Sequence, residues 1–146
     1  MAVGARMVES VLSPQASPRL LPRLSFSQLG AGVTAATVLV VLFGAVVRIT
    51  GSGAGCGQHW PSCNGEIAHL PKSVETWIEL SHRATSGLDF LGVLGLMVVA
   101  RQRFANHHPA RAAATAAFVL ILVEVLIGAR LVLLNLVGSN LSIDRV

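Results

Sequence analysis

Three long apolar segments constrain the fold of this chain more than any other feature of its sequence. They cover residues 30–49, 84–100 and 112–137. A helix needs about 20 mostly apolar residues to cross the hydrocarbon core of a bilayer, and the first and third segments reach that length as they stand. Three soluble helices would need a polar surface, but the 146 residues include only 11 basic and 7 acidic side chains. The segments therefore predict helices that lie in lipid.

The second segment is long enough to span a bilayer only if its helix begins upstream, near Trp77. That start places Glu79, His82 and Arg83 in the first turns of the helix. We therefore predict an all-α integral membrane protein with three transmembrane helices, at about residues 30–49, 77–100 and 112–137.

The composition supports this class and indicates which kind of molecule the basic residues contact. Charged residues make up 12% of the chain, against about 25% in ordinary soluble domains. The mean hydropathy is +0.67. The formal net charge is +4, but no basic stretch is interleaved with aromatic residues, as a groove for nucleic acid would be. We expect contact with anionic membrane lipid and none with nucleic acid.

The distribution of arginine predicts the topology, because Lys and Arg close to a span mark its cytoplasmic side. The segments before the first helix and between the other two are rich in arginine: Arg6, Arg19, Arg23, Arg101, Arg103 and Arg111. The loop after the first helix has only Lys72 beyond Arg48. We therefore predict a cytoplasmic tail over residues 1–29 and a membrane domain over residues 30–146. Within the membrane domain, residues 50–76 form an extracellular cysteine loop and residues 101–111 a cytoplasmic loop.

The N-terminal tail bears on the compartment. Pro14, Pro18 and Pro22 and several serines predict a disordered segment. A mitochondrial presequence is the alternative, since the tail is rich in Arg and Ser and has one acid, but its prolines oppose a continuous amphipathic helix. The expected location is the bacterial plasma membrane, with the mitochondrial inner membrane as the alternative.

Cys56 and Cys63 are the two cysteines of the chain, and both fall in the loop expected on the oxidising side. A structural or redox-responsive disulfide is one interpretation of this pair. A zinc site that includes His59 or His69 is another, although zinc fingers usually separate their cysteines by about two to four residues. Two unpaired thiols are the third.

A polar stripe begins where the second helix enters the membrane. Glu79 and His82 are three residues apart and so neighbours on a helix, and Ser86 and Asp89 continue that face. Ionisable groups in a span cost about 2.5–3.5 kcal/mol and usually face a bundle interior or a cavity. A histidine presented there suits axial ligation of heme iron. Alternatively, Glu79 and His82 lie at the interface near water.

Four short motifs around this stripe carry a family likeness. They are R-x-T-G-S-G from Arg48, the C-x6-C pair enclosing W-P, the C-N-G that follows, and E-x-x-H-R from Glu79. Together they resemble the N-terminal half of the cysteine-containing, bacterial type of heme A synthase. The likeness is strong from Arg48 to Gly87 and extends weakly to about Leu134.

The resemblance implies a membrane enzyme that contains heme b and oxidises a methyl group of heme O to the formyl group of heme A, for assembly of cytochrome c oxidase. It implies that His82 is an axial ligand of heme iron and that Glu79 is the catalytic acid. It also implies that Cys56 and Cys63 form an extracellular disulfide. Heme O is then the substrate, and heme O synthase is an expected partner.

The resemblance also exposes a difference. Family members have two four-helix halves, each with a pair of axial histidines, whereas this chain has three expected spans and no histidine in or after the third. We therefore expect a truncated chain, or one completed by a second polypeptide or by oligomerisation. Two alternatives are a non-catalytic heme-binding or oxidase-assembly membrane protein, and a packing module without heme.

Overall fold

The computed structural model describes residues 25–65, 71–134 and 136, and its regular secondary structure in these ranges is helical. It contains three long helices and one short 3-10 helix, which are α2 (Phe26–Ile49), η1 (Ser52–Ala54), α3 (Val74–Arg103) and α4 (Pro109–Leu133). All three long helices are long and apolar enough to cross a membrane. The predicted all-α membrane class is thereby confirmed. Most of the expected N-terminal tail, residues 1–24, and residues 137–146 lie outside the described ranges.

Capping residues set helix ends that differ from those expected from the apolar segments. Ser25 forms a capping box with Gln28, so α2 begins at Phe26 and includes residues assigned to the tail. The Ser73 hydroxyl accepts a hydrogen bond from the Thr76 N–H, so α3 begins three residues before Trp77. Pro109 occupies the first turn of α4, where its missing N–H costs nothing. Caps are polar and lie outside the apolar segments, which explains the differences.

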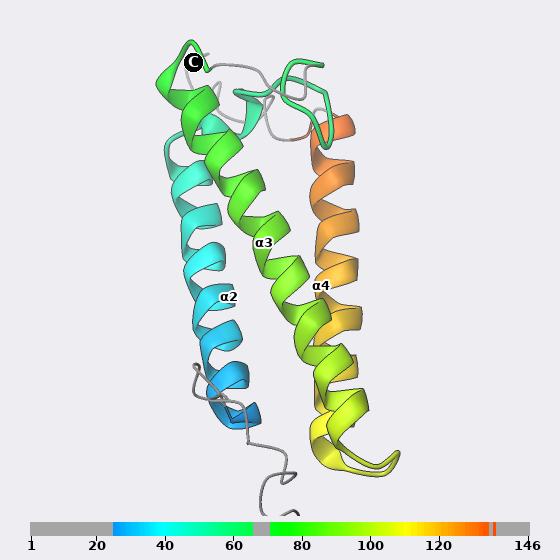
Figure 1. Cartoon of the computed structure of the whole chain (residues 1–146). Coiled ribbons are helices and arrows are strands. Elements are labelled where there is room, and N and C mark those ends of the chain that lie inside the picture. The colour runs from blue at the N-terminus through cyan, green and yellow to red at the C-terminus, as the bar shows by residue number, and fades with distance from the viewer. Residues whose placement is uncertain (1–24, 66–70, 135, 137–146) are drawn as a thin grey trace, which may run out of the picture.

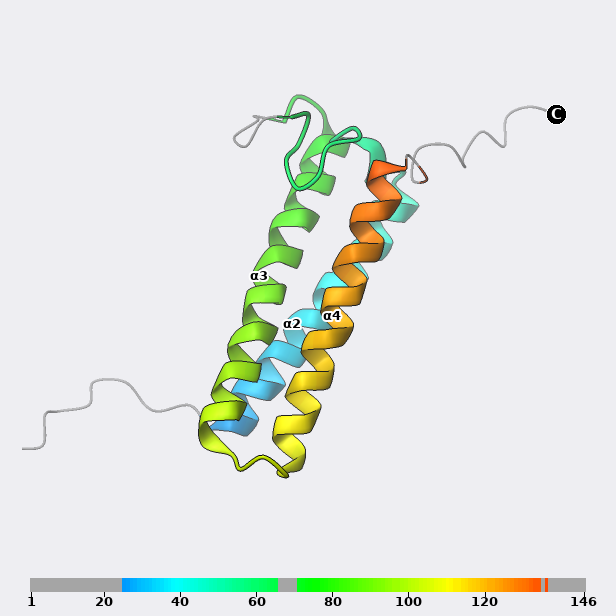
Figure 2. The same ribbon diagram turned by 90° about the vertical axis from the view of Figure 1, so that its right-hand side faces the viewer.

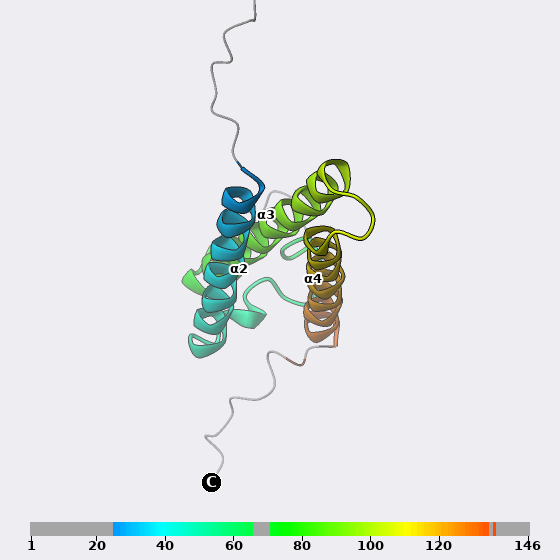
Figure 3. The same ribbon diagram turned by 90° about the horizontal axis from the view of Figure 1, so that it is seen from below.

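The three long helices form an antiparallel bundle in which α3 is the common partner (Figure 1). α2 and α4 run in one direction and α3 in the other, and both α2 and α4 pack on α3. Figure 2 shows η1 and the loop after it at the end opposite the α3–α4 connection. Seen from below in Figure 3, α2 and α4 lie on either side of α3. The loop therefore lies next to the first turns of α3, where the sequence places its polar stripe.

Small and aromatic residues close the bundle at the α3–α4 connection. Ala100 and Ala114 are buried together with Met97, and their small side chains let α3 and α4 approach closely. The rings of Phe26 and Phe104 pack edge to face with centroids 4.9 Å apart. This cluster ties the start of α2 to the end of α3.

A polar contact joins α2 and α3 in the middle of the bundle. Asp89 is buried, and one of its carboxylate oxygens lies 3.0 Å from the Thr37 hydroxyl. Large apolar side chains on the outer faces, such as Leu39, Leu88 and Leu120, are exposed. Exposed leucines are the surface that lipid tails cover, whereas an intramembrane carboxyl needs a partner inside the protein.

Candidate functional site

The loop that follows α2 is packed tightly against the start of α3. Gly51 adopts a left-handed conformation, with φ of 66°, and turns the chain into η1. A Cβ atom at Gly55 would lie 2.7 Å from the backbone of Glu75 and Thr76, so only glycine fits there. The Thr76 hydroxyl donates to the Gly55 carbonyl at 2.9 Å. The first turn of α3 therefore fixes the chain just before the first cysteine.

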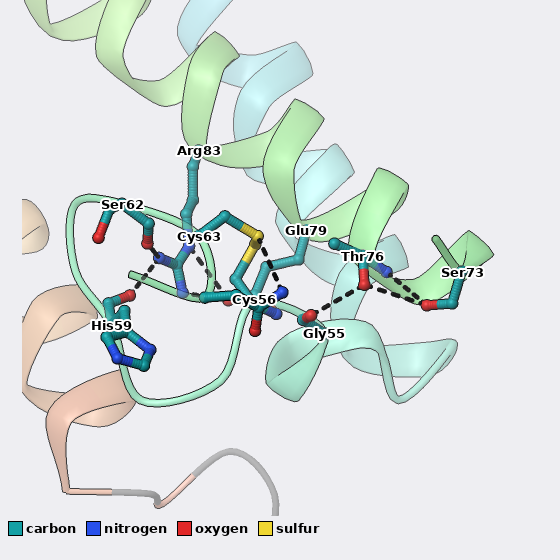
Figure 4. The surroundings of a disulfide bond; sticks show 10 residues. Gly55, Cys56, His59, Ser62, Cys63, Ser73, Thr76, Glu79 and Arg83 are labelled. Carbon is teal, nitrogen blue, oxygen red and sulfur yellow. Dashed lines mark hydrogen bonds and ion pairs between the residues drawn. A yellow bond between two sulfur atoms is a disulfide. The ribbon is translucent and has the colours of Figure 1, made fainter. Parts of the chain in front are cut away.

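Cys56 and Cys63 form a disulfide, with Cα atoms 4.4 Å apart (Figure 4). Both cysteines are buried, and the Asn64 N–H donates to the Cys56 carbonyl at 3.0 Å. With the sulfur atoms bonded to each other, the zinc and free-thiol interpretations do not apply to this structure. The His59 ring lies next to the loop glycines Gly57 and Gly65; His69 lies outside the described residues.

Glu79 points from α3 to the disulfide loop. Its side chain is buried, with 3% of the residue exposed. One carboxylate oxygen accepts the Cys56 backbone N–H at 2.7 Å. The other oxygen accepts a hydrogen bond from Arg83 Nε at 3.1 Å and forms an ion pair with Nη2 of the same residue. Both oxygens are therefore occupied, and the negative charge has a cationic partner four residues along the helix.

Arg83 completes the attachment of the loop, a role that the sequence reasoning missed. Its Nη1 donates to the Ser62 carbonyl at 2.7 Å and also to the His59 carbonyl. Figure 4 shows the guanidinium between the Glu79 carboxylate and these two carbonyls. The spacing of four residues from Glu79 in a helix was the available signal for the ion pair. No sequence signal identified the two carbonyl oxygens.

His82 lies one turn beyond Glu79, but its partners are on α2. Its ring packs edge to face with Phe43 at a centroid distance of 5.5 Å. A Cβ atom at Gly44 would lie 3.2 Å and 3.3 Å from two atoms of the imidazole, so glycine leaves the ring its space. The Nδ1 atom is buried and has no hydrogen-bond partner among the described residues. A neutral imidazole nitrogen that makes no hydrogen bond keeps the lone pair with which histidine ligates metals.

The polar stripe thus divides among several partners. Glu79 binds the loop and His82 lies on α2, whereas the Ser86 hydroxyl donates to the His82 carbonyl of its own helix at 2.8 Å. Asp89 binds Thr37. Glu124 of α4 is exposed. The contacts described for the His82 ring are with α2, at Phe43 and Gly44.

His82 is the described residue of this site whose side chain has the chemistry of a heme-iron ligand. The described residues contain no cluster of three or more His, Cys, Asp or Glu side chains that could hold a metal ion by themselves. Heme iron needs only axial ligands from the protein, because the macrocycle supplies the other four. His82, whose Nδ1 has no hydrogen-bond partner among the described residues, has the side-chain chemistry that this requirement calls for.

Comparison with known proteins gives a consistent set of relatives. The family model described as cytochrome oxidase assembly protein matches residues 27–143. A protoheme IX farnesyltransferase of Thermus thermophilus is 54% identical over 114 residues, which cover 78% of this chain and 19% of that protein. A heme A synthase of Bacillus mycoides is 40% identical over 112 residues, or 76% of this chain and 36% of that protein. No solved structure matches. The chain thus spans about a fifth to a third of the length of these relatives.

Proposed function

Because the chain belongs to the heme A synthase family of cytochrome oxidase assembly proteins, we propose that it forms the N-terminal part of a heme A synthase. That enzyme oxidises a methyl group of heme O to the formyl group of heme A, for the biogenesis of cytochrome c oxidase. The observation that carries the proposal is His82, a half-buried histidine between helices whose Nδ1 is buried without a partner among the described residues.

In this proposal His82 would ligate the iron of a bound heme. Phe43 and Gly44 hold and make room for its ring on the α2 side. When bound, the iron of heme b supplies the redox chemistry that no side chain here provides. Neutral imidazole is a common axial ligand for heme iron, and a histidine on a bundle helix presents it with little rotational freedom.

Glu79 is the proposed catalytic acid. A carboxylate can hold or move a proton, or stabilise positive charge that develops on a nearby carbon. The Cys56 N–H and Arg83 hold this carboxylate one turn from His82. Fixing a charged group in a site that excludes water strengthens its electrostatic effect.

In this proposal a partner completes the heme site. His59 lies in the disulfide loop, and His107 and His108 lie in the α3–α4 connection at the other end of the bundle. Apart from His82, the described histidines lie outside the long helices, so we propose that a second histidine ligand comes from a further segment, a second polypeptide or another copy of the chain. The Thermus relative carries the name of a farnesyltransferase, yet this chain matches only 19% of its length. We propose a heme O synthase as the partner that supplies the substrate; the similarity to a protein named for the farnesylation of protoheme IX supports a place in the same pathway.

The structure describes a membrane protein, and we propose that it resides in a bacterial plasma membrane with its N-terminus in the cytoplasm. Arg101 and Arg103 at the end of α3 and Arg111 at the start of α4 flank the α3–α4 connection. The disulfide lies at the opposite end of the bundle. Basic residues inside and a disulfide outside is the arrangement expected for such a membrane.

One observation favours a second candidate function, a non-catalytic heme-binding or oxidase-assembly protein. Both oxygens of Glu79 are engaged by the loop and Arg83, as they would be if this residue served only to fix the loop. The two functions differ in one outcome: only the first predicts that the wild-type protein, with its partner, converts heme O to heme A.

A hemin titration in detergent tests the heme site. The wild-type chain should bind hemin through His82 as its one histidine ligand and show reduced-minus-oxidised heme bands. His82→Ala should lose these bands, whereas His107→Ala, which changes an exposed histidine in the α3–α4 connection, should retain them. Equal spectra for wild-type protein and His82→Ala would remove His82 as the ligand.

A further inference from the structure

Arg83 bridges the disulfide loop and Glu79. Three of its nitrogen atoms donate hydrogen bonds, Nε and Nη2 to Glu79 and Nη1 to the His59 and Ser62 carbonyls. Its side chain is 12% exposed. The contacts of Nη1 join segments more than 20 residues apart in the chain, so they are tertiary and not part of the helix.

The shape of the guanidinium explains why one side chain can make these contacts. Its donors are fixed in a planar fork, so bonds on one edge constrain the bonds on the other. The two carbonyls belong to residues within the ring closed by the disulfide, and the N–H that binds the other oxygen of Glu79 belongs to Cys56, where this ring closes. The ring therefore contacts the carboxylate directly through Cys56 and indirectly through Arg83.

Charge adds to this geometric coupling. Glu79 is almost fully buried, and Arg83 is the cation paired with it. Without the guanidinium, the Cys56 N–H would be the one remaining donor to this carboxylate among the described residues. A buried carboxylate that loses its cationic partner reorients or takes up a proton.

We propose that Arg83 is a positioning residue that fixes the Glu79 carboxylate by joining it to the disulfide loop. The loop conformation then sets the orientation of Glu79, and a displacement of the loop displaces the carboxylate. The consequence for turnover rests on the proposed function, in which Glu79 is the catalytic acid. The coupling of loop to carboxylate is independent of it.

A double-mutant cycle over Glu79→Gln and Arg83→Gln tests the coupling without heme. The measured quantity is the rate at which a phosphine reductant opens the disulfide in the detergent-purified chain, followed by alkylation and mass analysis. We expect Arg83→Gln to accelerate reduction at least about tenfold, because the loop loses two of its anchors. The double variant should be no faster than Arg83→Gln alone within about twofold.

Arg101→Gln is the matched control, because Arg101 is an exposed arginine at the far end of the same helix. It should leave the rate unchanged. Arg83→Lys keeps the charge but not the fork, so it should give an intermediate rate in a protein that folds even if Arg83→Gln does not. Additive effects of the two glutamine substitutions, or a wild-type rate in Arg83→Lys, would overturn the proposal.

The effect on turnover separates positioning from general stability. In the full-length enzyme, Arg83→Lys should bind hemin within about twofold of wild type and lower heme A formation per bound heme at least about tenfold. Equal losses of hemin binding and heme A formation would mean that Arg83 only stabilises the fold. If the double-mutant cycle shows that Arg83 and Glu79 are coupled to disulfide reduction but the enzyme makes no heme A, the link between Arg83 and the loop stands. That result would refute only the proposed function.

Discussion

The backbone N–H of Cys56 donates a 2.7 Å hydrogen bond to the Glu79 carboxylate, so one end of the disulfide ring is bound directly to the first turns of α3. Glu79 and Cys56 are both buried, which leaves water little access to this bond. The loop is therefore part of the site and not a peripheral connection between helices.

Removing the disulfide should loosen the loop without unfolding the bundle. The ring is small, so the disulfide contributes less than the about 3 kcal/mol of a 15-residue ring. In the paired substitution Cys56→Ser and Cys63→Ser, amide hydrogen exchange over residues 51–65 should accelerate by about tenfold to a hundredfold. Exchange in α4, which forms its own helical hydrogen bonds, should be unchanged. Equal acceleration in α4 would contradict a local role for the disulfide.

Gly55→Ala should displace the loop. The added Cβ would lie 2.7 Å from backbone atoms of Glu75 and Thr76, and these atoms cannot move without shifting the start of α3. Overpacking of this kind costs about 1–3 kcal/mol, which denaturant unfolding in detergent would measure. Gly32→Ala, where nothing lies within 4 Å, is the control and should not destabilise. A loss of stability no larger than that of the control would show that Gly55 is not closely packed.

Gly44→Ala should weaken heme binding while sparing the helix. Alanine is a better helix former than glycine by up to about 1 kcal/mol, so α2 itself should be no less stable. The new Cβ would lie 3.2 Å from the His82 ring and force it to move. A cost of about 1 kcal/mol would lower hemin affinity about fivefold. Gly128→Ala, in open space on α4, should keep the wild-type affinity; equal affinities for both variants would contradict the packing described for His82.

Thr37→Val should weaken the association of α2 with α3. It removes the hydroxyl that binds Asp89, leaving the buried carboxyl without that donor. Hydrogen bonds between membrane helices contribute about 0.6 kcal/mol on average and up to about 1.7 kcal/mol. We expect a loss of unfolding free energy in this range, measured by denaturant titration in mixed micelles. Thr37→Ser retains the hydroxyl and should lose at most half as much unfolding free energy as Thr37→Val. An unchanged stability in Thr37→Val would mean that this bond contributes nothing.

Much of the fold follows from the sequence because lipid imposes strict requirements. Backbone groups in a bilayer must be satisfied within the protein, so three apolar segments of sufficient length predict three helices. The exact ends did not follow, since α2 and α3 begin at polar caps, Ser25 and Ser73, outside the apolar segments.

The site was predicted less completely. Glu79 and His82 were expected on one helical face, and they do lie one turn apart on α3, but their contacts go to the loop and to α2 respectively. Periodicity along one helix describes local neighbours and carries no information about which distant segment packs on each turn. For the same reason the sequence left the state of the cysteines open and did not reveal that Arg83 binds two loop carbonyls.

The proposed oxidation of heme O depends most directly on Glu79, and the heme content of cells that express the full-length protein tests it. Extracted hemes would be separated by chromatography for the wild type, Glu79→Ala and Glu75→Ala, the last a control that removes an exposed acid from the first turn of the same helix. We predict that wild type and Glu75→Ala accumulate heme A, while Glu79→Ala accumulates heme O with at least about a hundredfold less heme A. Heme A at the wild-type level in Glu79→Ala would contradict a catalytic role for this residue.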